Sequence, residues 1–308
     1  MHINISDIWS SSVEATHEAF LKAILAQALP PQSALLAKLL GRHGARLAIS
    51  RPAKLREIIE DVESFKSTAS DAQRKHFDAA CEKLFDYGRF ATKSSRPWSA
   101  YQLCMSSSYR MCPYCQQSLA VTIYRDHKTS SLRPTLDHFY PKSEYPYLAL
   151  SLYNLVPSCH TCNSSLKGKE NFFTRRHLHP YEDLEAISYD FDIVSYIAHR
   201  ASASTSPMPQ ISVKLPLAND PLHEKARRSV ETFLARERLA ISELELFRFV
   251  EALLVYSQGR LDEINASVFP GGKWSLTPET ALNFSRSNYK NEWLGAIKRD
   301  LYDLGWSE

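Results

Sequence analysis

Three polar residues near the middle of the chain could together hydrolyse a phosphodiester bond. Asp137 and His138 are adjacent, and Asn163 follows further along the chain. A neutral imidazole can take a proton from an attacking water near neutral pH. A carboxylate and an amide oxygen suit a hard divalent ion such as Mg²⁺ or Mn²⁺, which can neutralise the charge that develops on the phosphate and on the leaving 3′-oxygen. Asp137, His138 and Asn163 offer these groups.

Two pairs of cysteines frame this segment with a spacing typical of a zinc site. Cys112-Pro-Tyr-Cys115 and Cys159-His-Thr-Cys162 are both CxxC motifs, and each can place two thiolates on one side of a tight turn. Two such turns build a tetrahedral site of four sulfurs, which zinc favours. Because a closed site leaves no position for water or substrate, we expect this zinc to be structural. A redox pair is the alternative, and the absence of a thioredoxin-like βαβ context argues against it.

Taken singly, these residues have ordinary interpretations. An Asp-His pair is usually surface decoration, an Asn beside a Cys is often a helix cap, and Asn154 by itself would be a turn residue. Their order and spacing, framed by two CxxC motifs, favour a chemical site instead.

The arrangement resembles the HNH endonucleases, which have the ββα-metal fold. The family pattern is Asp-His-x-x-Pro, then an Asn before a short strand, then a helix bearing a His or Asn ligand followed by Lys-Gly. The zinc-supported subgroup carries CxxC before this pattern and CxxC-Asn at the helix start. The resemblance covers about residues 104–180, and the matching positions are Asp137-His138, Pro141, Asn154, Asn163 and Lys167-Gly168.

The resemblance implies a role for each residue. His138 is the general base, and Asp137 with Asn163 holds one catalytic Mg²⁺ or Mn²⁺ ion. Asn154 is counted with His138 in the catalytic machinery, where its side-chain amide would brace the segment that presents His138. The third letter is Asn rather than His, and Asn is the weaker ligand for soft metals, which favours Mg²⁺ or Mn²⁺ over catalytic zinc.

Within this family, three longer stretches look like the PtuB nucleases of Septu-type and retron-associated anti-phage systems. They are Leu-Asp-His-Phe-Tyr-Pro-Lys-Ser at 136–143, Tyr-Pro-x-Leu-Ala-Leu at 145–150 and Ser-Cys-His-x-Cys-Asn at 158–163. This resemblance implies that the chain is the nuclease effector of an anti-phage defence complex. It also implies an ATPase partner of the ABC/SMC type, similar to PtuA.

Basic residues are concentrated around the same segment. Residues 101–180 hold nine Lys and Arg against four Asp and Glu, although the whole chain has a net charge of only +3. A modest basic excess alone would indicate a solvated face, but beside a metal-ligand cluster it favours phosphate binding. Such contacts give affinity without sequence choice. The residues expected to bind nucleic acid, most simply DNA, are Lys142, Lys167, Lys169 and Arg175.

A zinc-stabilised subunit that binds nucleic acid or protein without cutting is the alternative function. A binding module has no need of a base beside a carboxylate, so the set of Asp137, His138, Asn154 and Asn163 favours the nuclease. The residues leave open whether DNA or RNA is cut and whether cleavage is of one strand or both.

The elements that must position this site are mainly helices. Apolar residues recur at helical spacing in segments that begin at Ser11, Ser33 and Pro52, and a further helix is expected over 72–87. We expect an N-terminal helical region over 1–95, a nuclease domain over 96–185 with a strand-like run at 119–124, and a C-terminal helical region over 186–308. The predicted fold class is mainly α with a small α+β core. The last helix is expected over 291–304.

Composition excludes several other classes of protein. Hydrophobic residues make up 44% and charged residues 23%, as in ordinary globular proteins, and nine glycines are too few for a turn-rich all-β fold. No apolar run of about 18 residues is present, so we expect no membrane span. The start, Met-His-Ile-Asn-Ile-Ser, has no basic or apolar signal region, and cytoplasmic residence is the expectation.

Overall fold

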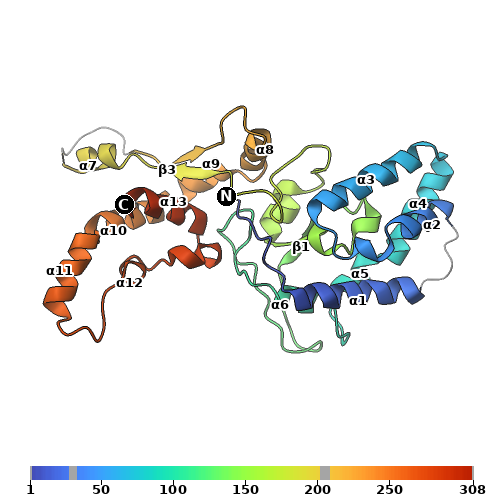
Figure 1. Ribbon diagram of the computed structural model, residues 1–308, viewed down its shortest axis with the longest axis horizontal. Coiled ribbons are helices and arrows are strands. Elements are labelled where there is room, and N and C mark those ends of the chain that lie inside the picture. The colour runs from blue at the N-terminus through green and yellow to red at the C-terminus, as the bar shows by residue number, and fades with distance from the viewer. Residues whose placement is uncertain (1, 28–32, 202–208, 307–308) are drawn as a thin grey trace. The chain divides into compact units, whose positions relative to one another are not determined.

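The computed structural model describes residues 2–27, 33–201 and 209–306. It is mainly helical with two small sheets (Figure 1), as the sequence predicts. The chain forms two compact units. The N-terminal unit comprises Asn4–Pro113 and Leu119–Leu184, and the C-terminal unit comprises Met1–Ile3, Tyr114–Ser118 and Glu185–Glu308. The N-terminal helices therefore share a unit with the predicted nuclease segment.

Capping chemistry fixes where the N-terminal helices begin. The Ser33 side chain accepts a hydrogen bond from the backbone N–H of Leu36, and Pro52 lies in the first turn of its helix. Ser70 and Gln73 form a reciprocal capping box. These residues start helices close to the predicted positions. The helices are α1 (Ser11–Gln27), α2 (Ala34–Arg42), η1 (Gly44–Leu47), α3 (Pro52–Ser67), α4 (Asp71–Leu84), α5 (Tyr87–Ala91) and α6 (Ala100–Met105). The two consecutive prolines Pro30 and Pro31 predict the end of the first helix, and this position lies outside the described residues.

The single helix expected over 72–87 is two helices. α4 ends at Leu84, and Asp86 caps α5 by accepting a hydrogen bond of 2.9 Å from the backbone N–H of Arg89. An Asp at the N-cap competes with continuation of the preceding helix, because its side chain satisfies the backbone donors of a new one. Tyr87 consequently lies at the start of α5 rather than at the end of a long helix.

The predicted small α+β core is present in the N-terminal unit. β1 (Thr135–His138) and β2 (Leu155–Ser158) pair antiparallel, with Asp137 opposite Val156. Their connection contains the short 3₁₀ helices η2 (Pro146–Leu148) and η3 (Leu152–Asn154), and a π-helix, η4 (Thr161–Lys167), follows β2. All of β2 is buried and β1 is buried from Leu136 onward, so this two-stranded sheet belongs to the core.

The strand-like run at 119–124 does not form a strand. Only two isolated bridges occur there, between Leu119 and Met111 and between Ile123 and Leu132. The side chains of Leu119 and Ile123 are 65% and 62% exposed. Alternating apolar residues stabilise a strand only where one face is buried, and here neither side chain has such a face.

The C-terminal unit contains a second two-stranded sheet and a set of helices. β3 (Ser188–Asp190) pairs antiparallel with β4 (Ser212–Lys214). The Ser- and Pro-rich composition of residues 202–216 predicts a linker or exposed loop, but β4 lies within this segment, and residues 202–208 lie outside the described residues. The helices are α7 (Ile193–Ala201), α8 (His223–Thr232), α9 (Ala235–Ile241), α10 (Glu243–Val255), α11 (Gln258–Val268), α12 (Pro278–Leu282), η5 (Arg286–Asn291) and α13 (Gly295–Trp306).

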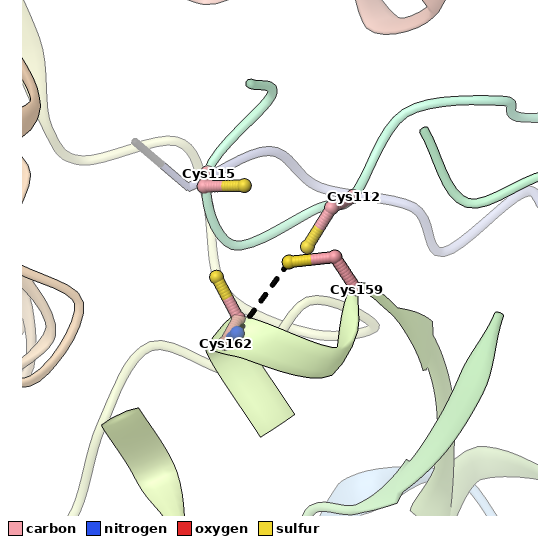
Figure 2. A group of neighbouring side chains, drawn as sticks. All are labelled: Cys112, Cys115, Cys159 and Cys162. Atoms are coloured by element: carbon pink, nitrogen blue, oxygen red, sulfur yellow. Dashed lines mark hydrogen bonds between the residues drawn. The ribbon is translucent and has the colours of Figure 1, made fainter. Parts of the chain in front are cut away.

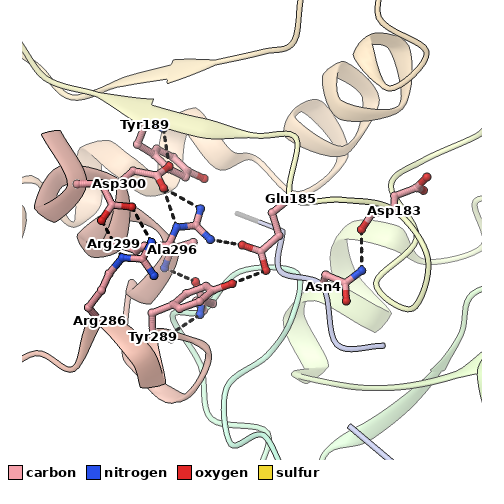
Figure 3. Close-up of polar contacts among 11 residues, drawn as sticks. Asn4, Asp183, Glu185, Tyr189, Arg286, Tyr289, Ala296, Arg299 and Asp300 are labelled. Carbon is pink, nitrogen blue, oxygen red and sulfur yellow. Dashed lines mark hydrogen bonds and ion pairs between the residues drawn. The ribbon is translucent and has the colours of Figure 1, made fainter. Parts of the chain in front are cut away.

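A part-buried polar network ties β3 to α13 in this unit (Figure 3). Arg299 pairs with both Glu185 and Asp300, and Asp300 accepts a hydrogen bond of 2.9 Å from the backbone N–H of Tyr189. Tyr289 donates a hydrogen bond of 2.9 Å to Glu185. α13 starts at Gly295 rather than at residue 291, and a Cβ at this position would lie 1.8 Å from the backbone oxygen of Tyr289. Only glycine allows that approach.

The sequence predicts no membrane-spanning helix. Among the described residues, none of the helices combines the length and the apolar character needed to cross a bilayer.

Candidate active site

Asp137, His138 and Asn163 line one cavity in the N-terminal unit. The cavity has a volume of about 390 Å³, and its walls come from the start of α5, from β1 and its flanking residues, and from the end of η4. The sequence places Asp137 and His138 in one segment and Asn163 in another. The pairing of β1 with β2, and the turn from β2 into η4, bring the two segments together.

The His138 imidazole is held in one orientation. Its Nε2 lies 3.0 Å from the backbone oxygen of Ala149. A carbonyl can only accept a hydrogen bond, so Nε2 carries the proton and Nδ1 of the neutral ring carries the lone pair. The ring of Tyr87 packs edge-on against it, with 4.5 Å between ring centroids. This arrangement selects the tautomer that a general base requires.

Burial dominates the titration of His138. It lowers the pKa to about 4, against an ordinary value of 6.5, and the nearby Lys142 and Lys167 act in the same direction. The hydrogen bond to Ala149 and the charge of Asp137 oppose this effect. The imidazole is therefore neutral at physiological pH.

Asn154 braces the loop between β1 and β2, as the resemblance implies. It is fully buried, and its Oδ1 accepts a hydrogen bond of 2.8 Å from the backbone N–H of Tyr140. Its Nδ2 donates to the backbone oxygens of Tyr140 and Leu148, each at 3.1 Å. Asn154 is not among the residues that line the cavity. It is thus a positioning residue that holds the segment ending one residue before Ala149, the partner of His138.

Asn163 lies in η4, where the helix is wider than an α-helix. The backbone N–H of Gly168 donates to the oxygen of Asn163 at 2.9 Å, five residues back, which is the π-helical pattern. Gly168 has a φ of +54°, a conformation that favours glycine. Asn163 is half-buried and its side chain reaches the cavity wall.

Lys167 differs from its predicted role as a surface phosphate contact. Its side chain is 2% exposed, and its Nζ lies 2.7 Å from Oδ1 of Asp137 and 2.6 Å from the backbone oxygen of His138. The buried ammonium therefore binds the carboxylate that the sequence assigns to a metal ion.

The other predicted phosphate contacts divide into two groups. Lys142 and Lys169 are exposed and line the cavity. Arg175 does not line it, and its guanidinium pairs with Glu170 at 2.5 Å. Arg175 is predicted to bind nucleic acid together with Lys142 and Lys169, but only the two lysines line the cavity.

Two residues of the cavity wall were missed in the sequence. Tyr87 comes from α5 and contacts His138, and Arg133 lies just before β1. No local signal singles out Tyr87, which falls at the end of an expected core helix. Arg133 could have been found as a basic residue shortly before the Asp-His motif.

The four predicted zinc ligands form a buried cluster (Figure 2). Their sulfur atoms all lie within 4.8 Å of one another, and tetrahedral zinc–sulfur bonds would set these distances at roughly 3.8 Å. The backbone N–H of Cys162 also donates to the sulfur of Cys159 at 3.4 Å, a contact that stabilises a thiolate. The group of Cys112, Cys115, Cys159 and Cys162 can therefore hold a metal ion such as zinc.

Two residues of the cysteine cluster adjoin segments that line the cavity. Cys159 follows β2 immediately, and Cys162 is adjacent to Asn163 within η4. A metal ion on these sulfurs would fix the turn between β2 and η4 and hence the position of Asn163. Cys81 and Cys104, which lie outside the cluster, are buried thiols. Burial raises the pKa of Cys104 to about 12.

Part of the chain is similar to Protein ea31 of Escherichia phage lambda, with 31% identity over 105 residues. The match covers 33% of this chain and 31% of the length of the phage protein. No family model matches the chain, and no solved structure matches it.

Proposed function

We propose that this protein is a metal-dependent nuclease of the HNH type that hydrolyses phosphodiester bonds of DNA. One observation carries the proposal: Asp137, His138 and Asn163 line a single cavity, and the only hydrogen-bonding arrangement open to His138 leaves its Nδ1 as the basic atom. An antiparallel strand pair followed by a short helix carries all three residues.

The imidazole of His138 would remove a proton from the attacking water. Nε2 keeps its proton on the Ala149 carbonyl, so Nδ1 takes up the new one, and the charge of Asp137 stabilises the imidazolium. The water oxygen bonds to phosphorus and the bond to the 3′-oxygen breaks. The leaving 3′-oxygen takes a proton from solvent water, so the products are a 5′-phosphate and a 3′-hydroxyl. Asn154 contributes by holding the loop that carries the Ala149 carbonyl.

The donor set fits a hard divalent ion. Asp137 offers a carboxylate and Asn163 an amide oxygen, and Mg²⁺ and Mn²⁺ prefer such ligands. When bound, Mg²⁺ or Mn²⁺ would supply charge neutralisation at the scissile phosphate and the leaving oxygen. The exposed ammonium groups of Lys142 and Lys169 would hold neighbouring phosphates in the same cavity. Zinc on the four cysteines would serve structure rather than chemistry, because four sulfurs complete its coordination.

Plasmid cleavage tests this function. Supercoiled plasmid is incubated with Mg²⁺ or Mn²⁺ and wild type, His138→Ala or His127→Ala protein. His127 is an exposed histidine of the same unit that does not line the cavity, so its variant is the matched control. We expect wild type and His127→Ala to cut and His138→Ala to lose at least 100-fold in rate, the usual contribution of a general base. The zinc content of all three proteins must be equal.

The other outcomes have clear meanings. Cleavage by His138→Ala at the wild-type rate would remove His138 from the mechanism. If no protein cuts while all three bind DNA, the protein is either a zinc-stabilised binding subunit or a nuclease that is inactive without its partner, and the same assay on the assembled complex separates the two.

We further propose that the nuclease is the effector of an anti-phage complex with an ATPase of the ABC/SMC type. The support is the resemblance of residues 136–163 to PtuB nucleases, together with the size of the C-terminal unit, none of whose described residues is among those that line the cavity. Co-expression with an ABC/SMC-type ATPase similar to PtuA, followed by purification at high salt, tests the assembly. Recovery of the chain alone, free of the ATPase, would contradict it.

A further inference from the structure

Lys167 is an unusual member of the cavity because its charge is buried. Its ammonium has three partners: Oδ1 of Asp137 at 2.7 Å, the backbone oxygen of His138 at 2.6 Å and the ring of Phe172, whose centroid is 5.0 Å away. The side chains of Lys167 and Asp137 are each 2% exposed. Water screens an interaction between such groups weakly, so the ion pair is a fixed part of the site.

The charges of the cavity wall do not favour a free cation. Asp137 is its one carboxylate, whereas four cationic side chains line it: Arg133, Lys142, Lys167 and Lys169. Four cationic side chains against one carboxylate give the wall an excess of three positive charges. Sites that bind Mg²⁺ through so few carboxylates complete the ligand set with substrate phosphates. The net positive charge of the cavity wall therefore attracts a phosphate group more strongly than a metal cation.

We propose that Lys167 makes binding of the divalent ion depend on nucleic acid. The ammonium neutralises Asp137, so the ion binds weakly to the protein alone, and a phosphate of the substrate supplies the missing negative charge. Metal ion and nucleic acid consequently bind with positive cooperativity, and by linkage each tightens the binding of the other equally. Lys167 is a positioning residue in this scheme, because it acts through Asp137. The inference rests on the proposed function of this site.

The direct test is metal affinity with and without DNA. Mn²⁺ binding is measured by electron paramagnetic resonance or calorimetry, alone and with a saturating short DNA duplex. All proteins carry His138→Ala to prevent cleavage, a change that keeps the backbone oxygen that Lys167 contacts. Lys167→Gln removes the charge and retains a hydrogen-bond donor. Lys169→Gln is the matched control, because Lys169 lines the same cavity but is exposed.

With Lys167 present, we expect the duplex to tighten Mn²⁺ binding about tenfold or more, within the usual range of coupling between sites. Lys167→Gln should bind Mn²⁺ about tenfold more tightly without DNA and should lose most of this coupling. Lys169→Gln should weaken DNA binding and keep the coupling. Zinc content and the unfolding midpoint establish that each variant is folded, and Lys167→Met is the second variant if Lys167→Gln is not.

The results separate this inference from the proposed function. If wild type cuts plasmid but DNA leaves the Mn²⁺ affinity unchanged, or if both glutamine variants keep the same coupling, the role of Lys167 is overturned while the nuclease stands. If wild type neither cuts nor binds Mn²⁺ in the presence of DNA, the proposed function fails and the inference fails with it.

Discussion

His17 and His138 hold two consecutive peptide carbonyls. Nε2 of His138 donates to the oxygen of Ala149 at 3.0 Å, and Nε2 of His17 donates to the oxygen of Leu150 at 2.7 Å. One histidine comes from β1 and the other from α1. The N-terminal helical region therefore fixes the same short segment that orients the proposed base, and it belongs to the construction of the site.

This relationship predicts a pH-dependent stability. His17 is fully buried, and its Nδ1 also accepts a hydrogen bond of 3.1 Å from the indole N–H of Trp98. Burial lowers the pKa of His17 to about 4 from an ordinary 6.5, although the bond to Leu150 opposes it. Between pH 6.5 and 4 the unfolded chain binds a proton that the folded chain does not. The free energy of unfolding is thus retained above pH 6.5 and falls as the pH drops, by about 1.4 kcal/mol per pH unit.

The substitution His17→Gln removes the contribution of His17 to the pH dependence of the free energy of unfolding. Urea unfolding at pH 7.5 and pH 5.0 should show the gap in stability between wild type and His17→Gln shrinking by about 2 kcal/mol at the lower pH. His76→Gln, at an exposed histidine of α4, should keep a constant gap. A gap for His17→Gln that is the same at both pH values would show that His17 does not titrate as its surroundings indicate.

Asn154 yields a second prediction, on stability and turnover. Asn154→Ala removes three hydrogen bonds and leaves the backbone groups of Tyr140 and Leu148 buried without this partner. We expect a loss of about 3 kcal/mol or more in chemical denaturation. The turnover number for plasmid should fall while KM changes little, because Asn154 does not line the cavity.

Asn154→Asp sharpens the test, because it keeps the acceptor for the Tyr140 N–H but cannot donate to the two carbonyls. It should be no more stable than the alanine variant. Asn171→Ala is the comparison, because Asn171 is only half-buried and its side-chain hydrogen bonds, to the Tyr145 hydroxyl and the backbone N–H groups of Phe173 and Thr174, are part-buried or exposed. An Asn154→Ala protein within 1 kcal/mol of Asn171→Ala would contradict the bracing role.

The parts of the site that the sequence predicts are those encoded over short distances. A CxxC motif sets a turn by itself, and the Asp-His pair needs only a strand to present it. Ser33 and Pro52 similarly mark helix starts through capping, which involves only the first turn. For this reason the buried cysteine cluster and the small α+β core could be predicted.

The parts that could not be predicted depend on packing between distant segments. Tyr87 reaches His138 only because α4 ends at Leu84 and α5 is packed beside β1. Lys167, in a Lys-Gly pair after a polar helix, has the local appearance of a surface cation. Its burial follows from the position of Asp137, thirty residues earlier in the chain. A contact between residues thirty positions apart cannot be inferred from the residues next to either one.

The cysteine cluster leads to a third prediction, on metal content. Purified wild type should contain about one zinc per chain, and Cys159→Ser should lose it, with an unfolding midpoint lower by roughly 10 °C. Cys104→Ser is the control, since Cys104 is buried outside the cluster and should leave the zinc in place. Equal zinc in the Cys159→Ser and wild-type proteins would show that the metal lies elsewhere.

The exposed cations of the cavity lead to a fourth prediction, on DNA affinity. Lys142 and Lys169 line the cavity, whereas Arg175 lies outside it and is paired with Glu170. Each lysine that contacts a phosphate releases a counterion, so Lys142→Ala and Lys169→Ala should each lower the slope of log Kd against log salt by about 0.9 for duplex DNA. The loss of affinity should not depend on sequence.

Arg175→Ala is the control for this prediction, because Arg175 lies outside the cavity. All three substitutions remove one positive charge from the same unit, so a general electrostatic attraction would change the three slopes alike. A specific phosphate site changes two slopes and leaves the third near the wild-type value. Fluorescence anisotropy with one duplex over a range of salt concentrations measures all four proteins. Three equal slopes would place DNA on a broad basic surface rather than in the cavity that holds Asp137 and His138.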